Sequence, residues 1–299
     1  MSRSLLILNG KKSDYPGFRE TVESLRSSGL EILVRVTWEY GDCQRFVDEA
    51  NELGIERVVA CGGDGTLNEV ANGLMNLPRE KRPYLGIVPL GTANDFAVSC
   101  CLPQDVSEAL KNSVEQPPQT IDMARAEDHS FINVASLGFG ATVTNETPVE
   151  LKNFLGGGAY TLMAILKSLN FQPYPIRVQT PEDRFEGEAI VGAVCNGRQT
   201  GGGQVLAKEA FLNDGLLDTV LILPFPLPRI DQVLQEISGP GDSGEFVKFF
   251  RSPWTEIEAG EAIPVNLDGE PHRFDKVRFE LVENAIDLVI PKDCPCILS

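Results

Sequence analysis

The hydrophobic positions in the first half of the chain alternate between short apolar runs and stretches with helical spacing. Buried strands are predicted at 4–9, 31–36, 58–62 and 84–90, and helices at 17–28 and 42–53, the second with Asp42 as its cap. Strands that alternate with helices favour a parallel sheet covered on both faces. Ligands bind such sheets at the carboxyl ends of the strands, where Thr37 and the turns at 62–69 and 91–95 fall.

After about Phe131 the pattern changes to short strand-like pieces, several of which alternate apolar with polar residues. They lie at 132–139, 185–195, 216–223, 257–258, 277–282 and 285–290, and turns rich in Gly, Pro, Asn and Asp separate them. This pattern predicts an antiparallel β-sandwich with one or two helical insertions, for example at 160–169. We therefore divide the chain into domains 1–133 and 134–299, and the last residues can return to the first domain.

Composition narrows the function classes. The 299 residues carry 26 basic and 43 acidic side chains, a net charge of −17, which disfavours nonspecific nucleic-acid binding and broad adsorption to an anionic membrane. With no apolar run of eighteen residues and no secretion signal pattern, a cytoplasmic location is expected. The seven cysteines are scattered and only two histidines occur, so we expect reduced thiols and no zinc site.

The turn Gly62-Gly63-Asp64-Gly65-Thr66 stands between a predicted strand and a predicted helix. Glycines allow close approach to a ligand, and the first amides of a helix accept phosphate oxygens. The Asp64 carboxylate repels a phosphate unless a cation or a sugar hydroxyl stands between them; alternatively, Asp64 only bonds its own backbone in an ordinary turn. No Walker sequence is present, and Asn68 replaces the third glycine of a dinucleotide fingerprint.

A second turn, Gly91-Thr92-Ala93-Asn94-Asp95, repeats this order of glycine, hydroxyl and carboxylate before a helix. The alternative is that Thr92 or Asn94 merely caps that helix. Two Asp-Gly pairs follow in the second half, at 214–215 and 268–269. Each can present a carboxylate to a ligand or metal, or can simply form a hairpin turn.

Four segments together resemble the diacylglycerol kinase catalytic family, and most closely its bacterial YegS-type lipid kinases. They are GGDGTLNEV at 62–70, LGIVPLGTANDFA at 85–97, NDGLLD at 213–218 and NLDGEP at 266–271. The resemblance covers essentially the whole chain. It implies a nucleotide-binding α/β domain of the phosphofructokinase and NAD-kinase type, followed by a β-sandwich domain that takes the lipid.

The resemblance also implies roles for individual residues. Glu270 would be the general base, and Asp95 would help to organise phosphate and metal. Mg²⁺, or Ca²⁺, would be held by Asp214 and by main-chain oxygens of Phe211 and Leu216. The ATP contacts would be Thr37, Gly63, Asp64, Gly65, Thr66, Leu67, Asn68, Glu69 and Thr92.

The implied activity is ATP- and Mg²⁺-dependent transfer of a phosphoryl group to a lipid hydroxyl, with phosphatidylglycerol or diacylglycerol as the substrate class. Contact with the membrane would be peripheral and transient, and no nucleic-acid partner is expected. Two alternatives remain open at this point: a kinase of a soluble hydroxyl substrate such as NAD, and a non-catalytic nucleotide sensor. The sequence does not indicate an oligomeric state.

Overall fold

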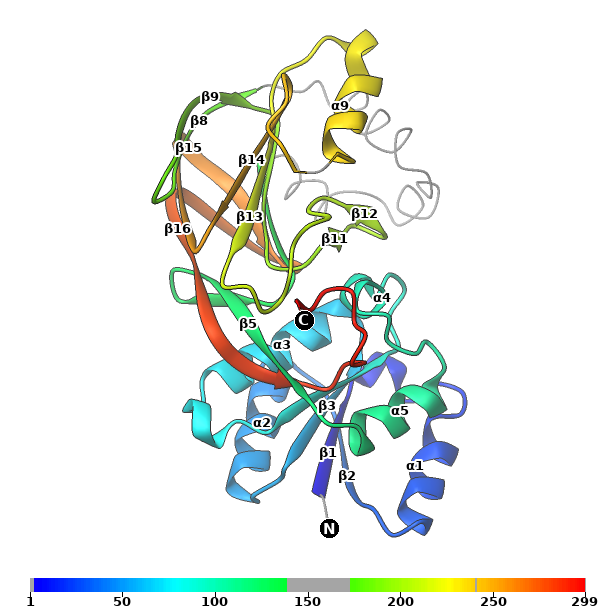
Figure 1. Ribbon diagram of the computed structural model, residues 1–299. Helices are drawn as coiled ribbons and strands as arrows, with labels where there is room; N and C mark the ends of the chain where they lie inside the picture. Colours follow the sequence, from blue (N-terminus) through cyan, green and yellow to red (C-terminus); the bar gives the residue numbers. More distant parts are fainter. Residues whose placement is uncertain (1–2, 139–172, 240, 299) are drawn as a thin grey trace. The chain divides into compact units, whose positions relative to one another are not determined.

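The computed structural model describes residues 3–138, 173–239 and 241–298, and it divides into two compact units (Figure 1). Met1–Met123 and Glu283–Ser299 form the first unit, and Ala124–Val282 form the second. The divisions fall inside two strands, β5 (Gln119–Ala126) and β16 (Glu270–Leu288). The insertion expected at 160–169 lies outside the described residues.

A parallel sheet forms the centre of the first unit. Its strands are β1 (Arg3–Leu8), β2 (Glu31–Val36), β3 (Arg57–Gly62) and β4 (Tyr84–Pro89), in the order β4-β3-β1-β2. The last residues of β16 extend this sheet, because Leu288 pairs in parallel with Leu85 of β4. The apolar runs of β1 and β3 are buried along nearly their whole length, as expected of strands covered on both faces.

Helices cover both faces of this sheet (Figure 1). The core on one face joins β1, β3 and β4 to apolar residues of α1 (Phe18–Ser27) and α5 (Val106–Glu115). On the other face α2 (Asp42–Glu52) packs against α3 (Asp64–Met75), where a Cβ on Gly73 would come within 3.0 Å of Val47. The predicted α/β fold is thereby confirmed.

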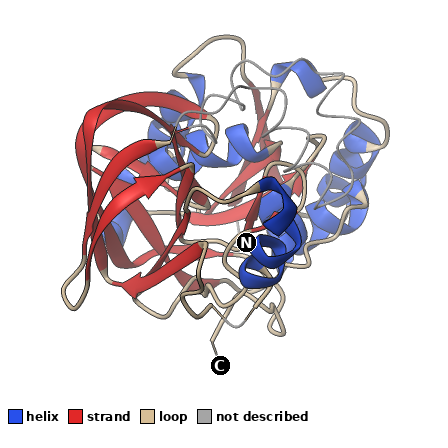
Figure 2. Ribbon diagram, turned by 90° about the horizontal axis from the view of Figure 1, so that it is seen from above, coloured by secondary structure: helices blue, strands red, loops and turns tan. Residues whose placement is uncertain are grey.

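Antiparallel strands make up most of the second unit, and Figure 2 distinguishes the strands of the molecule (red) from its helices (blue). The strands run in the order β14-β13-β10-β7-β15-β16, and β15 also pairs with β8, which pairs with β9. Their bounds are β7 (Val134–Gly138), β8 (Tyr174–Gln179), β9 (Arg184–Ala189), β10 (Val191–Cys195), β13 (Leu217–Ile222), β14 (Val247–Ser252) and β15 (Trp254–Leu267).

Strand β15 pairs with β7 over one stretch and with β8, which pairs with β9, over another. Its register with β16 shifts between Glu258 and Ile263; residues before the shift pair with β8, and residues after it pair with β7. A shift of this kind bends a strand, which lets one long strand serve two layers. The short hairpins β5–β6 (His129–Phe131) and β11 (Gln199–Thr200)–β12 (Gln204–Val205) complete the unit.

Two of the predicted strand pieces prove to be one element. The stretches at 277–282 and 285–290 were separated in the sequence by polar residues, but β16 continues through them to Leu288. Asn284 has φ of +52°, and its amide donates to the Asp122 carboxylate at 2.7 Å. The polar residues therefore mark a local irregularity within a strand, and the prediction of a turn there was wrong.

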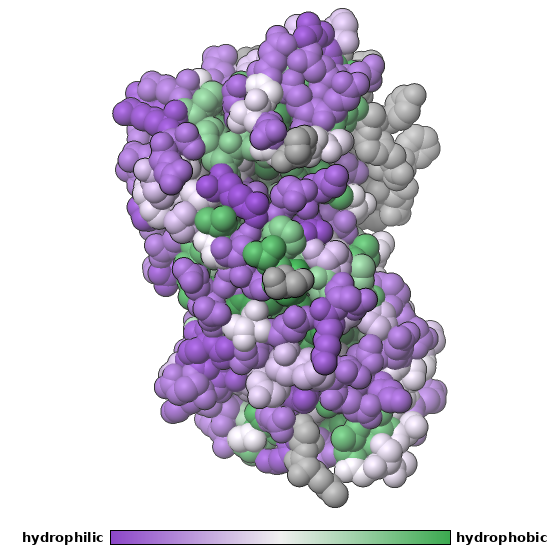
Figure 3. All heavy atoms as spheres, in the orientation of Figure 1, coloured by the Kyte–Doolittle hydropathy of each residue, from purple (hydrophilic) through white to green (hydrophobic). Residues whose placement is uncertain are grey.

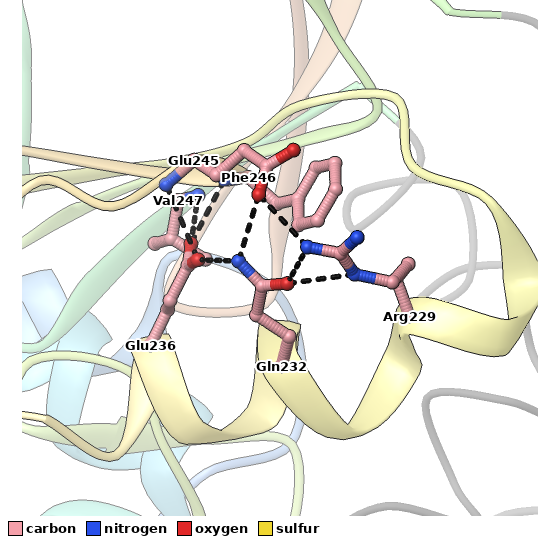
Figure 4. Close-up of polar contacts among 6 residues, drawn as sticks. All are labelled: Arg229, Gln232, Glu236, Glu245, Phe246 and Val247. Atoms are coloured by element: carbon pink, nitrogen blue, oxygen red, sulfur yellow. Dashed lines mark hydrogen bonds and ion pairs between the residues drawn. The ribbon is translucent and has the colours of Figure 1, made fainter.

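Helix α9 (Ile230–Ile237) is fastened to the chain that leads into β14 (Figure 4). The Glu236 carboxylate accepts hydrogen bonds from the amides of Glu245, Phe246 and Val247 at 2.8–3.2 Å. Burial raises the pKa of Glu236, but hydrogen bonds from Gln232 and these amides outweigh it and leave the pKa below its usual value. This network fixes the helix beside β13 and β14.

The exterior is largely polar on the face drawn in Figure 3, in keeping with the high charge of the chain. Among the described residues, no helix has both the length and the apolar character needed to cross a bilayer.

Candidate functional site

Three of the four parallel strands of the first unit end directly before a polar residue or a glycine, and β4 is followed by Leu90 and then Gly91. Asn9 follows β1 and donates to the Thr66 hydroxyl at 2.8 Å, and the amide of Gly10 donates to the Thr37 hydroxyl at 3.1 Å. These two hydrogen bonds join the loops after β1, β2 and β3. Sequence reasoning missed Asn9, although its position directly after a buried strand was the available signal.

Asp64 connects the two glycine turns. It is the first residue of α3, and its carboxylate accepts hydrogen bonds from the amides of Asp95 and Phe96, both at 3.1 Å. These amides open α4 (Asp95–Ser99), so Asp64 caps a helix that lies 31 residues further along the chain. Asp64 is therefore more than a residue of an ordinary local turn.

Burial of the Asp64 carboxylate raises its pKa, and the nearby Asp95 raises it further, while the hydrogen bonds from the amides of Phe96 and Asp95 partly offset both effects. The alternative in which Asn94 caps α4 with its side chain is not what the structure shows. The Asn94 side chain instead bonds back to the main chain of Gly91, with its oxygen accepting from the Gly91 amide at 2.9 Å.

The two turns touch through their glycines. A Cβ built on Gly91 would lie 2.6 Å from the Cα of Gly63 and 2.5 Å from the side-chain oxygen of Asn94. Real Cβ atoms do not approach so closely, so the main chains can meet only because residue 91 is glycine; a Cβ on Gly63 would lie 3.2 Å from the Cα of Gly91, a tight contact. A small hollow beside this contact is lined by Gly63, Asp64 and Asn94 with apolar residues of β3, α3, β4 and α4.

Side chains after the first turn point in part into the protein. Leu67 is buried in the core, and Asn68 is buried and accepts a hydrogen bond from the side chain of Asn72 at 2.9 Å. The amide of Leu67 donates to the carbonyl of Gly63, the first hydrogen bond of α3. The amides of residues 65 and 66 precede that bond and have no main-chain acceptor within the helix, whereas the amide of Asp64 interacts with its own carboxylate.

Gly65 differs from the other glycines of these turns. A Cβ added to Gly65 would meet no atom within 4 Å, and Gly65 is exposed. Packing within the protein therefore does not require glycine at this position. The space over the first amides of α3 is open for a ligand atom.

The loop after β2 is shaped by Asp42, which sequence analysis assigned as the cap of α2. The cap position is occupied by Gly41, with φ of +88°, and Asp42 is the first helical residue. Its carboxylate reaches back and accepts from the amides of Trp38 at 2.6 Å and Glu39 at 3.1 Å. Asp42 thus holds the loop that follows Thr37, and the assignment as a cap was wrong by one residue.

We expect Asp42→Asn to lower the urea midpoint at pH 7, with a difference from the wild type that narrows as the pH falls from about 4 towards 2. Hydrogen bonds from the amide of Trp38, from Arg45 and from the amide of Glu39 lower the pKa of Asp42 to about 2. A folded pKa below the unfolded value of about 3.9 stabilises the fold above that value, and the stabilisation is lost as the pH falls through the folded pKa. Asp48→Asn, exposed on the same helix, is the control; a constant difference across this range would contradict the assignment.

In the second unit Asp214 lies in the turn before β13, with little of its side chain exposed (6%). One carboxylate oxygen accepts from the amide of Leu216 at 3.0 Å, and the other binds the guanidinium of Arg251. The same guanidinium lies near the Phe211 ring, with 6.0 Å between its central carbon and the ring centroid. The three residues expected to hold a metal are therefore neighbours, and Arg251 supplies the positive charge there.

Asp218 is a further acidic residue at this place that sequence reasoning missed, although it closes the NDGLLD motif. One of its oxygens lies 3.9 Å from Arg251, and the other is buried with no hydrogen-bond partner among the described residues. The pKa of Asp218 is raised to about 6, mainly by burial. The charge of Asp214 also raises this pKa, and the charge of Arg251 lowers it. A buried carboxylate oxygen without a donor is suited to a cation.

Glu270 is the first residue of β16 and is exposed. The preceding turn is a hairpin in which Asp268 has φ of +48° and Gly269 φ of +104°. The Asp268 carboxylate accepts from the amides of Ile132, Asn133 and Val134 at 2.7–3.0 Å, so it anchors the turn instead of pointing to a ligand. The Asp-Gly pair at 268–269 therefore forms a hairpin turn. Glu270 directly follows this turn, which the hydrogen bonds of Asp268 hold in place.

The predicted site residues thus fall into two groups. Thr37, residues 63–69, Thr92 and Asp95 lie at the carboxyl edge of the sheet in the first unit, where Thr92 is exposed and Asp95 is buried. Phe211, Asp214, Leu216 and Glu270 belong to the second unit. Within each unit the residues stand on turns that hydrogen bonds to other segments hold in place.

Comparison with known proteins places both halves of the chain. Residues 3–126 match the diacylglycerol kinase catalytic domain, and residues 133–290 match the YegS C-terminal NAD kinase β-sandwich-like domain. A relative from Shewanella frigidimarina, named "Probable lipid kinase YegS-like", is 45% identical over 98% of this chain and 96% of its own length. One with the same name from Chromohalobacter salexigens is 47% identical over 96% of this chain and 93% of its own.

A solved structure shows the same fold. The crystal structure of a "putative diacylglycerol kinase" from Bacillus anthracis aligns with a TM-score of 0.83 and 26% identity, covering 98% of both chains. The family resemblance seen in the sequence and the expected pair of an α/β and a β-sandwich domain are confirmed. The chain belongs to the YegS-like branch of the diacylglycerol kinase catalytic-domain family, and it is a kinase.

Proposed function

We propose that this kinase transfers the γ-phosphoryl group of ATP to the hydroxyl of a lipid of the phosphatidylglycerol or diacylglycerol class. The names of its relatives, lipid kinase and diacylglycerol kinase, support a lipid acceptor. The observation that carries the nucleotide part is the pair of glycine turns, held together by Asp64 at the carboxyl ends of β3 and β4. Ligands of parallel sheets bind at that edge.

The first turn of α3 is suited to phosphate. The amides of residues 65 and 66 lack main-chain acceptors within the helix, and the space over Gly65 is open. The Thr66 hydroxyl is buried and already accepts from Asn9, so phosphate oxygens would meet main-chain donors before side chains. Because Asp64 is hydrogen-bonded to the amides at the start of α4, part of its charge is offset before a nucleotide arrives.

A divalent cation fits the second unit. Asp214 and the main-chain oxygens of Phe211 and Leu216 would hold Mg²⁺, or Ca²⁺. The buried oxygen of Asp218, which has no donor within the described part of the chain, supports a cation at this place. In phosphoryl transfer such an ion neutralises charge on the phosphates. The Arg251 guanidinium occupies part of this position and would have to yield one oxygen of Asp214.

For the remaining residues we propose the roles that the family resemblance implies. Glu270 would accept the proton of the lipid hydroxyl as the oxygen attacks the γ-phosphorus, and ADP would leave with the electrons of the broken P–O bond. Asp95 would help to organise the phosphates at the start of α4, where its amide is bound by Asp64. Thr37 and Thr92 would complete the nucleotide contacts.

Membrane contact would be peripheral and brief, and made by a few aromatic or apolar residues instead of a basic surface. Trp38 and Tyr40, in the loop after β2, are 94% and 91% exposed, and such side chains favour the bilayer interface. We expect Trp38→Ala with Tyr40→Ala to reduce co-sedimentation with phosphatidylglycerol vesicles at least about threefold. The control is Arg19→Ala, because Arg19 is exposed on α1. Phe185→Ala is not a suitable control, because Phe185 is half-buried against the core.

We also propose that Mg²⁺ bridges acidic side chains of the protein and anionic headgroups of the membrane. Co-sedimentation should then fall when the metal is chelated and when salt is raised. Binding that ignores both would contradict bridging, and binding that survives the double substitution would remove the aromatic pair from the contact.

The deciding experiment is transfer of ³²P from the γ-position of Mg·ATP to a panel of lipids in detergent micelles, with NAD as a soluble acceptor. Label in phosphatidylglycerol or diacylglycerol is the expected result. Label in NAD would support the soluble alternative. ATP binding without any labelled product would favour the nucleotide sensor, and both of these outcomes would overturn the lipid acceptor.

A further inference from the structure

A cluster of three buried thiols lies in the first unit, outside the residues assigned to phosphoryl transfer. Cys100 follows the last residue of α4, and Cys294 and Cys296 belong to the C-terminal segment. Their sulfur atoms all lie within 4.8 Å of one another, and the side chains are 0%, 4% and 1% exposed. The expectation from the sequence, that the cysteines lack the spacing of metal ligands, did not account for residues 194 positions apart that meet in the fold.

The spacing of the sulfurs suits a bound ion. Three sulfurs around one ion at about 2.3 Å are about 4 Å apart, so the observed separations must shrink by less than about one ångström. Cys294 and Cys296 form a Cys-Pro-Cys segment inside a turn closed by the amide of Ile297 on the carbonyl of Cys294 at 3.2 Å. Two ligands on one short turn and a third on a helix end make a pre-arranged set.

We propose that Cys100, Cys294 and Cys296 bind a single thiophilic cation, Cu⁺, through three sulfur ligands. Thiolates select soft ions such as Cu⁺ and Zn²⁺. Among the described residues no histidine, carboxylate or further cysteine joins the three sulfurs as a fourth ligand. Zn²⁺ in structural sites takes four ligands, whereas Cu⁺ is satisfied by a trigonal set of three.

The binding step exchanges protons for the ion. Each thiol that becomes a ligand releases its proton to water as its sulfur–copper bond forms, and no electrons are transferred. Binding is therefore expected to release acid and to weaken as the pH falls.

The position of the cluster indicates what the ion would do. Cys296 donates a hydrogen bond to the carbonyl of Ser99 at 3.2 Å, so the C-terminal segment already contacts the end of α4. The start of the same short helix carries the amides that Asp64 binds. An ion on the three sulfurs would fasten the C-terminal segment to the helix that supports the second glycine turn. This inference does not depend on the identity of the phosphoryl acceptor.

The test is anaerobic titration of the reduced full chain with Cu⁺ in competition with a chromogenic Cu⁺ chelator, followed by copper X-ray absorption. We expect one tightly held ion per chain with a shell of three sulfurs at about 2.3 Å, and a rise in Tm on loading. Cys100→Ala and Cys296→Ala should each lower the affinity at least tenfold. Cys43→Ala, buried elsewhere, and Cys101→Ala, exposed beside the cluster, should leave it unchanged.

Circular dichroism and urea midpoints establish whether Cys100→Ala and Cys296→Ala are folded. Their affinities for Cu⁺ are compared with that of the wild type only when both variants are folded. No retained ion in the folded wild type, or unchanged affinity in either folded cluster variant, would overturn the site. A parallel titration with Zn²⁺ separates the two soft ions. Tighter retention of Zn²⁺ with a fourth nitrogen or oxygen ligand would overturn the assignment to Cu⁺.

Discussion

Replacing Glu270 with glutamine is expected to lower kcat at least about 100-fold while the affinity for ATP stays unchanged. Glutamine keeps the shape of the side chain but cannot accept the proton of the attacking hydroxyl. General base catalysis typically contributes about 10² to 10⁴ in rate, so the lower end of this range already corresponds to about 2.7 kcal/mol of transition-state stabilisation.

The structure makes this substitution a clean one. Glu270 is exposed at the start of β16, and the turn before it is held by Asp268 on three main-chain amides and by Asn266, which accepts from the Gly269 amide at 2.7 Å. None of these bonds involves the Glu270 carboxylate. The variant should therefore keep the Tm of the wild type, and any loss of rate should come from chemistry.

Glu261→Gln is the matched control for Glu270→Gln, because Glu261 is exposed on the neighbouring strand β15. It should retain full activity. Glu270→Asp should recover part of the lost rate, since it restores a carboxylate at a shorter reach. If kcat of Glu270→Gln stays within about threefold of the wild type, another group removes the proton, and Glu270 has no part in the reaction.

Local pattern was sufficient to predict the elements that carry the first unit's site. The apolar run at 58–62 and the glycine turn after it gave β3 and the start of α3 nearly as the structure has them. The same holds for β4 and the second turn. Continuous apolar runs, which mark strands buried on both faces, and apolar positions of period 3.6, which mark helices, are both local properties of the sequence.

Contacts between distant segments were not predictable in the same way. Nothing near Asp64 in the sequence shows that its carboxylate binds amides 31 residues later, and nothing near Cys100 points to Cys296. The polar residues around Asn284 have the composition of a turn. The chain nevertheless continues as a strand there with a positive φ at Asn284, whose amide donates a hydrogen bond to the distant Asp122, and the local sequence does not show this bond. Such errors arise where the tertiary fold overrides a local preference.

Gly65→Ala and Gly91→Ala are expected to separate the nucleotide contact from the packing of the two turns. Gly91→Ala places a Cβ 2.6 Å from the Cα of Gly63, which forces the turns apart. It should destabilise the protein by about 1–3 kcal/mol, the usual cost of overpacking, and abolish ATP binding. Thermal unfolding and isothermal titration with Mg·ATP measure the two effects.

Gly65→Ala should behave differently, because its Cβ meets no protein atom within 4 Å and alanine favours a helix by up to about 1 kcal/mol over glycine. The Tm should be unchanged or slightly higher. Affinity for ATP should nevertheless fall at least about tenfold, since the methyl group would occupy the space over the first amides of α3 where a phosphate is proposed to lie. Loss of ligand affinity without loss of stability is the result that a purely structural glycine would not give.

Arg19→Ala is the control by position, because Arg19 is the second residue of α1 as Gly65 is of α3, and it is exposed. It should change neither Tm nor ATP affinity. If Gly65→Ala binds ATP as tightly as the wild type, the phosphates do not lie over the start of α3, and the nucleotide must be placed elsewhere on the sheet edge. If Gly65→Ala lowers the Tm as much as Gly91→Ala does, the protein itself needs the open space beside Gly65 in order to fold.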